Sequence, residues 1–374
     1  MNILYSFNKN GFEADYWQRE IAGSSCEHYT FIPFNHGEYL NPERYVRAQL
    51  LDNLYYRRDS DLFRLYDDFE AVVLKYNAAA VIVDNYPPYH PDYLRRISAY
   101  KVLRTSDGPI SAYDRDFAYL HAYDHVLYHS PAYSADLTME EKLRYCGAHN
   151  IDFWPLALFD TAFDAKETEE SLASKTRDID VIFIGALHLG KMPLLARVKK
   201  AFGSRCRIHG LTSLKRNLYF NAKFGFPAWI RPIPFEEYVP LYQRSAVGIN
   251  LHNRGKYTVG NYRLFDLPAN GVMQISDGGE YLSKYFRVGE EIISYDTDDE
   301  LLEKLHYYLK HPQERQAIAL KGYRRVLRDH RIRDRLRAAG ELIERGMDRS
   351  GWKQRQSASH RSHIAITSKR CSNC

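Results

Sequence analysis

A loop with two glycines and two cations is followed by an arginine and an aspartate, a spacing that suits an anionic ligand carrying hydroxyl groups. The loop predicted over residues 252–260 can approach and neutralise an anion through four residues, Arg254, Gly255, Lys256 and Gly260. A short helix predicted over 261–271 adds Arg263, whose planar fork can hold two oxygens. It also adds Asp266, whose carboxylate can accept two hydroxyl protons.

The elements around this loop place it at one edge of a sheet. The apolar runs 246–251 and 272–277 predict buried parallel strands on either side of it. A third strand, predicted over 179–184, ends at Gly185, where a glycine lets the backbone come close to phosphate. A plain strand-to-helix turn at Gly185 is the alternative.

The order of these elements resembles the donor-binding half of GT-B glycosyltransferases, in particular the CgeB-like group of the spore-maturation-protein type. The elements are a strand, a loop, the stretch 261–271 with Asn261, Arg263 and Asp266, a strand that ends in Asp277, and a helix after Tyr295. The resemblance covers about residues 178–340 and is traceable more weakly back to about residue 101. It implies an α/β protein of the GT-B fold, with two Rossmann-like doubly wound domains that face each other across a cleft.

The resemblance also implies an activity. Members of this family move a sugar from a nucleotide-diphosphate-sugar donor to an acceptor hydroxyl. For this chain we expect a glycan, lipid-linked or protein acceptor, and a role in bacterial cell-surface glycan. No other cofactor and no metal is expected, because an arginine, helix dipoles and glycine amides can meet the diphosphate charge.

Individual residues take expected roles from the resemblance. Arg263 stands where the family binds the diphosphate; a salt bridge from Arg263 to Asp266 is the alternative. Asp266 stands where the second glutamate of an E-x7-E signature binds ribose, although its side chain is one methylene shorter. Thr258 stands at the first glutamate, so a carboxylate contact to the donor sugar is absent there. Arg254 and Lys256 are candidate helpers.

An inverting transfer also needs a general base near the acceptor hydroxyl. Asp107 follows a predicted strand in a Gly-Pro turn and resembles an aspartate turn of the family. Asp84 also ends a strand, and His90 is a third candidate. Capping of a turn or helix is the alternative for both aspartates.

Charge and length indicate the organisation of the chain. Its 374 residues predict an N-terminal domain over 1–165, a linker over 166–178, a donor-binding domain over 179–347 and a disordered basic tail over 348–374. The tail holds six Lys or Arg and one Asp, which accounts for the formal charge of +5. The rest is near neutral, which argues against a nucleic-acid partner. Cys371 and Cys374 offer only two of the four ligands of a zinc site.

The expected localisation is cytoplasmic. No N-terminal stretch has the pattern of a signal peptide, and no apolar run approaches the roughly 20 residues that cross a bilayer. A single basic helix predicted over 312–337 could meet anionic lipid at the inner membrane face, and a solvated basic face is the alternative.

Two other functions are compatible with the same fold. A sugar-nucleotide epimerase or hydrolase would need no acceptor. A non-catalytic coat or interaction protein would not bind nucleotide diphosphates, and Thr258 in place of a glutamate fits that alternative.

Overall fold

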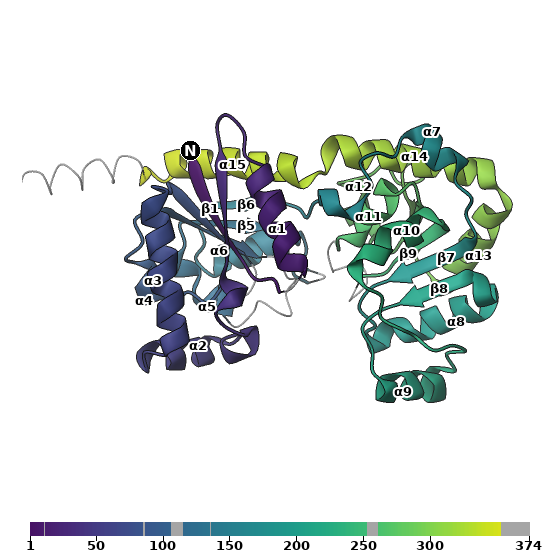
Figure 1. The fold of residues 1–374 in the computed structure, drawn as a ribbon, viewed down its shortest axis with the longest axis horizontal. Helices are drawn as coiled ribbons and strands as arrows, with labels where there is room; N and C mark the ends of the chain where they lie inside the picture. The colour runs from purple at the N-terminus through teal and green to yellow at the C-terminus, as the bar shows by residue number, and fades with distance from the viewer. Residues whose placement is uncertain (11, 85–86, 106–114, 135, 253–260, 353–374) are drawn as a thin grey trace, which may run out of the picture. The chain divides into compact units, whose positions relative to one another are not determined.

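The computed structural model describes residues 1–374 except 11, 85–86, 106–114, 135, 253–260 and 353–374. The chain divides into two compact units. Unit 1 comprises residues 1–129, 136–154 and 333–374, and unit 2 comprises 130–135 and 155–332. Each contains a parallel sheet with helices packed against it (Figure 1).

Unit 1 is built on a six-stranded sheet of order β2-β1-β3-β4-β5-β6. Alternating apolar strands and amphipathic helices produce it, as the sequence predicted. Its elements are β1 (Asn2–Phe7), α1 (Phe12–Gly23), β2 (Thr30–Asn35), α2 (Ala48–Tyr56), α3 (Ser60–Lys75), β3 (Ala80–Asp84), α4 (Pro91–Leu94), β4 (Tyr100–Thr105), α5 (Arg115–Ala118), β5 (His125–Tyr128), α6 (Met139–Tyr145), β6 (Ile151–Phe153) and α15 (Ile332–Arg349).

Unit 2 is built on a five-stranded sheet of order β11-β10-β9-β7-β8, and every pairing is parallel. Its core joins buried side chains of β7, β9 and α8, among others. Its elements are α7 (Glu169–Ser174), β7 (Ile179–Ile184), α8 (Met192–Phe202), β8 (Cys206–His209), α9 (Leu214–Phe224), α10 (Tyr238–Gln243), β9 (Ser245–Asn250), α11 (Arg263–Ala269), β10 (Met273–Ser276), α12 (Gly279–Ser283), β11 (Ile293–Ser294), α13 (Asp298–Lys310) and α14 (Pro312–Asp329).

The compact units correct the domain boundaries expected from the sequence. The first boundary falls after Trp154, not at 165, and α15 belongs to unit 1 instead of the donor-binding unit. Contacts within unit 1 explain this assignment: the indole nitrogen of Trp154 donates to the carbonyl of Arg335 at 2.7 Å, and Arg349 pairs with Asp152 at 2.5 Å. Gly346 lies so close to His125 and Tyr100 that a side chain there would force them to shift.

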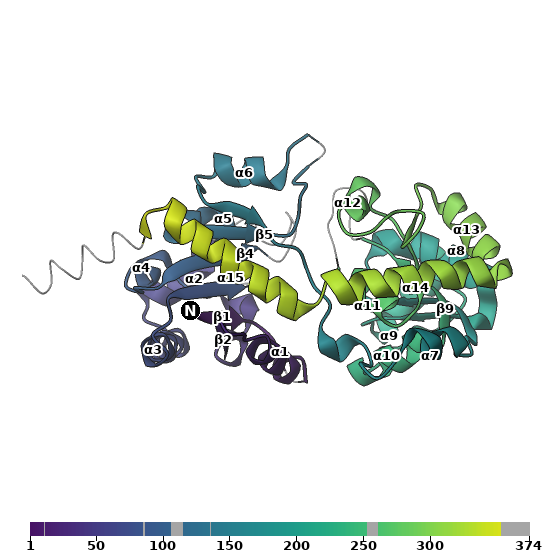
Figure 2. The same cartoon turned by 90° about the horizontal axis from the view of Figure 1, so that it is seen from above.

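The stretch expected to be a linker, 166–178, is a structured part of unit 2. It contains α7, which begins with a capping box in which Thr168 and Ser171 satisfy each other's backbone amides. Tyr323 of α14 donates to the carbonyl of Glu167 at 3.1 Å, and Gln316 donates to that of Ala173 at 2.7 Å. In both Figure 1 and Figure 2, α7 lies beside α14.

The single helix expected over 312–337 is two helices, α14 and α15 (Figure 2). The helix breaks because residues 330–332 pair with Leu158: the Leu158 amide donates to the carbonyl of His330 at 2.7 Å, and the Ile332 amide donates to that of Leu158 at 2.8 Å. Several of its cations also have acidic partners, for example Arg324 with Glu169. The basic face expected on this helix is therefore partly neutralised.

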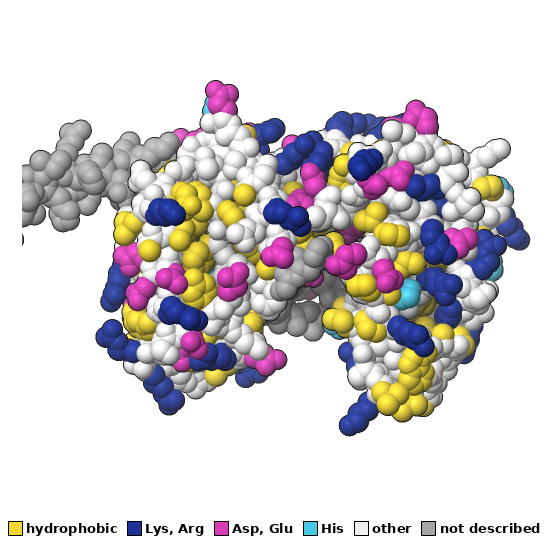
Figure 3. All heavy atoms as spheres, in the orientation of Figure 1, with side chains coloured by type: hydrophobic (Ala, Val, Ile, Leu, Met, Phe, Trp, Pro, Cys, Tyr) yellow, Lys and Arg dark blue, Asp and Glu magenta, His cyan; other side chains and the backbone are white. Residues whose placement is uncertain are grey.

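In Figure 3, side chains of both charge signs are scattered over the visible face. Within the described ranges, no helix is both long and apolar enough to cross a membrane.

Candidate functional site

The carboxyl ends of three adjacent strands of unit 2 bring the candidate residues together. β7 ends at Ile184, β9 at Asn250 and β10 at Ser276. β9 lies between the other two, with Gly248 paired to Ile182 and Asn250 paired to Ser276. Because all three strands are parallel, the residues that follow them share one edge of the sheet, where ligands of open α/β sheets bind.

Arg263 is buried at this edge, at the first residue of α11. Its Nε donates to the carbonyl of Ile184 at 2.6 Å, and its Nη1 donates to Oδ1 of Asn250 at 2.9 Å. Its guanidinium carbon lies 4.5 Å from the centroid of the Phe183 ring. Within the described ranges no ion pair joins Arg263 to Asp266, and Nη2 has no acceptor. The guanidinium is therefore fixed in place, and three of its five N–H groups, two of them on Nη2, are left for a ligand.

Lys191 is a second buried cation here, and the sequence analysis did not single it out. Its Nζ lies 5.8 Å from the Phe183 ring centroid, and among described residues it makes neither an ion pair nor a hydrogen bond. Burial, together with the charge of Arg263, lowers the pKa of Lys191 to about 8. A buried ammonium that makes no direct contact with a described carboxylate is a candidate to bind an anion. Its position at the start of α8, six residues after Gly185, was the available signal.

Asp266 lies one turn along α11 from Arg263 and is half-buried. Burial raises the pKa of its carboxyl group to about 8, and the charge of Arg263 opposes that rise. In the described part of the chain, no side chain or amide donates to this carboxylate. A half-buried carboxyl group without a protein partner can accept hydroxyl groups from a ligand.

His252 and Asp277 form a pair after β9 and β10. The Asp277 carboxylate lies 2.6 Å from Nδ1 of His252 and also accepts the backbone amide of His252 at 2.9 Å. With Nδ1 donating to the carboxylate, Nε2 is left as an acceptor. His252 is only 5% exposed, and its Nε2 has no hydrogen-bond partner among the described residues. Asp277 therefore orients the imidazole of His252 so that Nε2 can accept a hydrogen bond at the carboxyl edge of the sheet.

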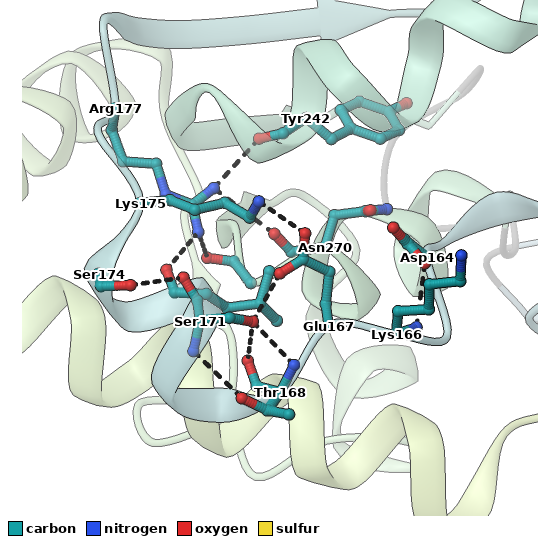
Figure 4. Close-up of polar contacts among 12 residues, drawn as sticks. Asp164, Lys166, Glu167, Thr168, Ser171, Ser174, Lys175, Arg177, Tyr242 and Asn270 are labelled. Carbon is teal, nitrogen blue, oxygen red and sulfur yellow. Dashed lines mark hydrogen bonds and ion pairs between the residues drawn. The ribbon is translucent and has the colours of Figure 1, made fainter.

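Arg177 supports α11 from its other end (Figure 4). Its guanidinium donates to five backbone carbonyls, at distances from 2.9 to 3.5 Å, those of Leu172, Tyr242, Ser245, Asn270 and Gly271. Gly271, expected to end the helix, has a φ of +66°, a conformation that glycine adopts without strain. Arg177 thus joins the ends of α10 and α11 to the segment that precedes β7.

Several predicted site residues lie outside the described ranges: Arg254, Lys256, Thr258, Gly260 and the candidate base Asp107. Asn261 is described, and its side-chain oxygen is buried with no hydrogen-bond partner in the described part of the chain. Gly185 is described as well, and its amide donates to the carbonyl of His209 at 3.0 Å.

Asp84 has a structural role in unit 1 that argues against its use as a base. It is 2% exposed, pairs with Nη1 of Arg104 on the neighbouring strand at 2.5 Å, and accepts the hydroxyl of Tyr5 at 2.8 Å. The carboxylate is held by a buried guanidinium and a hydroxyl, and breaking this buried ion pair would leave the charge of Arg104 uncompensated. We therefore withdraw Asp84 as a candidate base.

His90 is also held by its surroundings. Its ring stacks on that of Tyr55 with centroids 4.0 Å apart, and its Nε2 lies 3.2 Å from the carboxylate of Asp52. Burial lowers its pKa. Its Nδ1 accepts the amide of Asp92, so the residue caps α4.

Known proteins were compared with the sequence and with the structure. A family described as glycosyl transferase-like matches residues 192–340. No curated protein matches the sequence. The match begins at the start of α8 and spans most of unit 2, including α11 and α14.

Solved structures resemble nearly the whole chain. Sucrose-phosphate synthase from Thermosynechococcus elongatus has a TM-score of 0.61 at 11% identity, over 92% of this chain and 98% of that one. HepE from Anabaena, in complex with UDP-glucose, has a TM-score of 0.58 at 10% identity, over 92% and 99%. A glycosyltransferase from Rickettsia africae has a TM-score of 0.56 at 13% identity, over 92% and 98%. At these identities the likeness shows the fold: two Rossmann-like units of the GT-B type.

Proposed function

We propose that this protein is a glycosyltransferase of the CgeB-like group, which moves a sugar from a nucleotide-diphosphate-sugar donor to a hydroxyl of a glycan, lipid-linked or protein acceptor. The observation that carries the proposal is the pair of buried cations Lys191 and Arg263 over the Phe183 ring, neither of them in an ion pair with another described residue. Two buried cations at the carboxyl edge of a parallel sheet suit a diphosphate. The matched family and the UDP-glucose complex of HepE support the same reading.

Each part of the donor has a candidate partner in this arrangement. Nη2 of Arg263 and the ammonium of Lys191 bind the diphosphate, and Gly185 leaves the space in which the guanidinium lies. The Asp266 carboxylate accepts the ribose hydroxyls. Nε2 of His252 accepts a hydroxyl of the transferred sugar, a role that its orientation by Asp277 favours.

The chemistry follows from this assignment. An acceptor oxygen forms a bond to the anomeric carbon, and the bond from that carbon to the β-phosphate oxygen breaks. Negative charge grows on the departing diphosphate, where Arg263 and Lys191 stabilise it. The acceptor's proton passes to a base, for which Asp107 stays the prediction. No metal is proposed, because the two cations supply the charge.

A nucleotide-binding experiment tests the proposal. Calorimetry with UDP, GDP, TDP and CDP on the full chain should give a dissociation constant for at least one of them. Lys191→Gln should weaken that binding at least tenfold, because a charge-assisted contact is lost. Lys321→Gln is the matched control, since that lysine is half-exposed on α14. Failure of every nucleotide to bind would favour a non-catalytic protein.

An activity assay distinguishes a glycosyltransferase from a sugar-nucleotide hydrolase or epimerase. With donor alone, a transferase should release little free sugar, and release should rise when the acceptor is added. Rapid formation of free sugar or of an epimer without an acceptor would show a hydrolase or epimerase instead.

A further inference from the structure

Five large apolar side chains are exposed together on α9 and on the loops next to it. They are between 40% and 80% exposed, and we call them the α9 surface: Leu211, Leu214, Leu218, Tyr219 and Trp229. In Figure 3 a group of hydrophobic side chains gathers at the lower right, where Figure 1 places α9. A protein surface rarely leaves this much apolar area in contact with water unless something covers it.

The α9 surface is rigidly built. Asn217, on the inner side of α9, donates to the carbonyl of Ile230 at 3.0 Å and accepts the Ile230 amide at 2.9 Å. Asn221 donates to the carbonyl of Ala228 at 3.1 Å. These bonds fix the chain on both sides of Trp229 against the helix. Phe220 is fully buried and anchors α9 to the core.

The stretch of chain that carries the α9 surface is basic. Residues 181–235 contain no Asp or Glu and ten Lys or Arg, which are Lys191, Arg197, Lys199, Lys200, Arg205, Arg207, Lys215, Arg216, Lys223 and Arg231. On α9 itself, Lys215, Arg216 and Lys223 make no ion pair with any described residue. Lys223 lies over the rings of Tyr219 and Phe224, 5.2 and 5.6 Å from their centroids.

We propose that the α9 surface docks on an anionic lipid surface. Leucines and a tryptophan beside unpaired cations match the interface of a bilayer, where apolar side chains enter the acyl boundary and cations meet headgroup phosphates. A second copy of the chain is a poorer occupant, because two such faces would bring the cations Lys215, Arg216 and Lys223 of each copy together.

Docking at this surface would bring lipid near the donor site. Nη2 of Arg216, in the first turn of α9, donates to the carbonyl of Leu187 at 2.7 Å. Leu187 belongs to the loop that joins Gly185 to Lys191. The α9 surface therefore borders the loop that carries a proposed diphosphate ligand. This location differs from the basic helix predicted at 312–337, for which the sequence left lipid contact and a solvated face open.

Vesicle sedimentation with the full chain tests the proposal. Vesicles of phosphatidylglycerol and phosphatidylcholine should bind the protein at low salt, whereas vesicles of phosphatidylcholine alone should bind it much less. The double variant Leu214→Ser/Leu218→Ser should lower the partition coefficient at least tenfold. Lys215→Gln and Lys223→Gln should each lower it roughly fivefold. Leu74→Ser is the matched control, since Leu74 is 67% exposed on α3 of unit 1.

The melting temperature, the tryptophan fluorescence and the oligomeric state provide further tests of the proposal. The leucine variants should keep the wild-type melting temperature, because the altered side chains are exposed. Vesicles should shift the tryptophan fluorescence of the wild type, and Trp229→Phe should remove most of that shift. Absence of binding to anionic vesicles, or equal loss in the Leu74 control, would overturn the proposal. A dimer that the leucine variants convert to monomer, without vesicle binding, would show self-association instead and would equally overturn it.

Discussion

Gly185 lies directly against the guanidinium of Arg263. A Cβ at residue 185 would overlap Nη2 and would stand 3.0 Å from the guanidinium carbon. Only glycine therefore lets the arginine occupy the space beside the end of β7. This is a close approach of a side chain to backbone, whereas the sequence suggested either a close approach of phosphate or a plain strand-to-helix turn at this glycine.

Substitution of this glycine should displace Arg263. Gly185→Ala is expected to weaken nucleotide-diphosphate binding at least tenfold and to destabilise the protein by about 1–3 kcal/mol, because the crowded guanidinium must move. Gly190→Ala, in the same loop, is the control: an added Cβ there meets nothing within 4 Å. Calorimetry and urea denaturation measure the two effects. Wild-type affinity in Gly185→Ala would contradict the role of Arg263.

Donor binding should depend on pH with an optimum near 8. The pKa of Asp266 is raised to about 8, so its carboxylate is protonated below that value and the ribose contact is weakened. The pKa of Lys191 is lowered to about 8, so its ammonium loses charge above that value and the diphosphate contact is weakened. Affinity for a nucleotide-diphosphate sugar should therefore rise with pH up to about 8 and fall beyond it.

Two variants test which residue causes the rise in affinity on the acid side and which causes the fall on the alkaline side. Asp266→Asn should remove the rise on the acid side, and Lys191→Gln should remove the fall on the alkaline side. The stability of the ligand-free protein gives a second check on Asp266. A carboxyl group whose folded pKa is raised loses stability as pH rises from about 4 to about 8, so Asp266→Asn should gain stability relative to wild type over that window. A flat affinity profile in wild type would argue against both contacts.

His252 should discriminate sugar from nucleotide. If its Nε2 accepts a hydroxyl of the transferred sugar, His252→Ala should weaken binding of the nucleotide-sugar several-fold and leave the nucleotide diphosphate nearly unchanged. Asp277→Asn should have a smaller effect of the same kind, because it removes the group that orients the ring. Equal weakening of both ligands would place His252 at the diphosphate instead.

Much of the fold follows from sequence periodicity. The strand Ile179–Ile184 agrees with its predicted range to the residue, since it is an apolar run between polar turns. β2 was missed because Pro33 interrupts its pattern, and the structure places this strand at the edge of the sheet, where proline is tolerated. The break between α14 and α15 depends on pairing with Leu158, a residue far away in sequence.

Some residues of the candidate site could likewise be predicted from local sequence, and others depend on residues far away in the chain. Arg263 and Asp266 were recognisable because their spacing on one short helix is local. Lys191, His252 and Asp277 follow different strands, and only the parallel order of those strands brings them to one edge. Asp84 was misjudged for the same reason: its partner Arg104 lies on the next strand, and no local pattern reveals that ion pair.

Arg177 should be a major contributor to the stability of unit 2. Arg177→Met would leave five backbone carbonyls without their donor, and we expect a loss on the order of 3 kcal/mol. Arg197→Met is the control, since Arg197 is exposed and pairs with Asp299, an interaction of ~1 kcal/mol or less. Urea denaturation compares them. Similar losses of unfolding free energy in both variants would show that the bonds from Arg177 to the five carbonyls do not contribute more than a surface ion pair.

The C-terminal segment should divide into a dispensable part and a packed part at Trp352. The sequence predicted that all of 348–374 is a tail, but α15 runs to Arg349, and the Trp352 ring meets that of Tyr100 edge to face with centroids 5.8 Å apart. Truncation after Trp352 should leave the melting temperature and nucleotide affinity unchanged. Truncation after Arg349 removes an aromatic pair worth ~0.5–1.5 kcal/mol and should lower the melting temperature by roughly 2–6 °C. The substitution Trp352→Ala should reproduce that drop in the full chain, and a drop of the same size on removing only residues 353–374 would contradict this division.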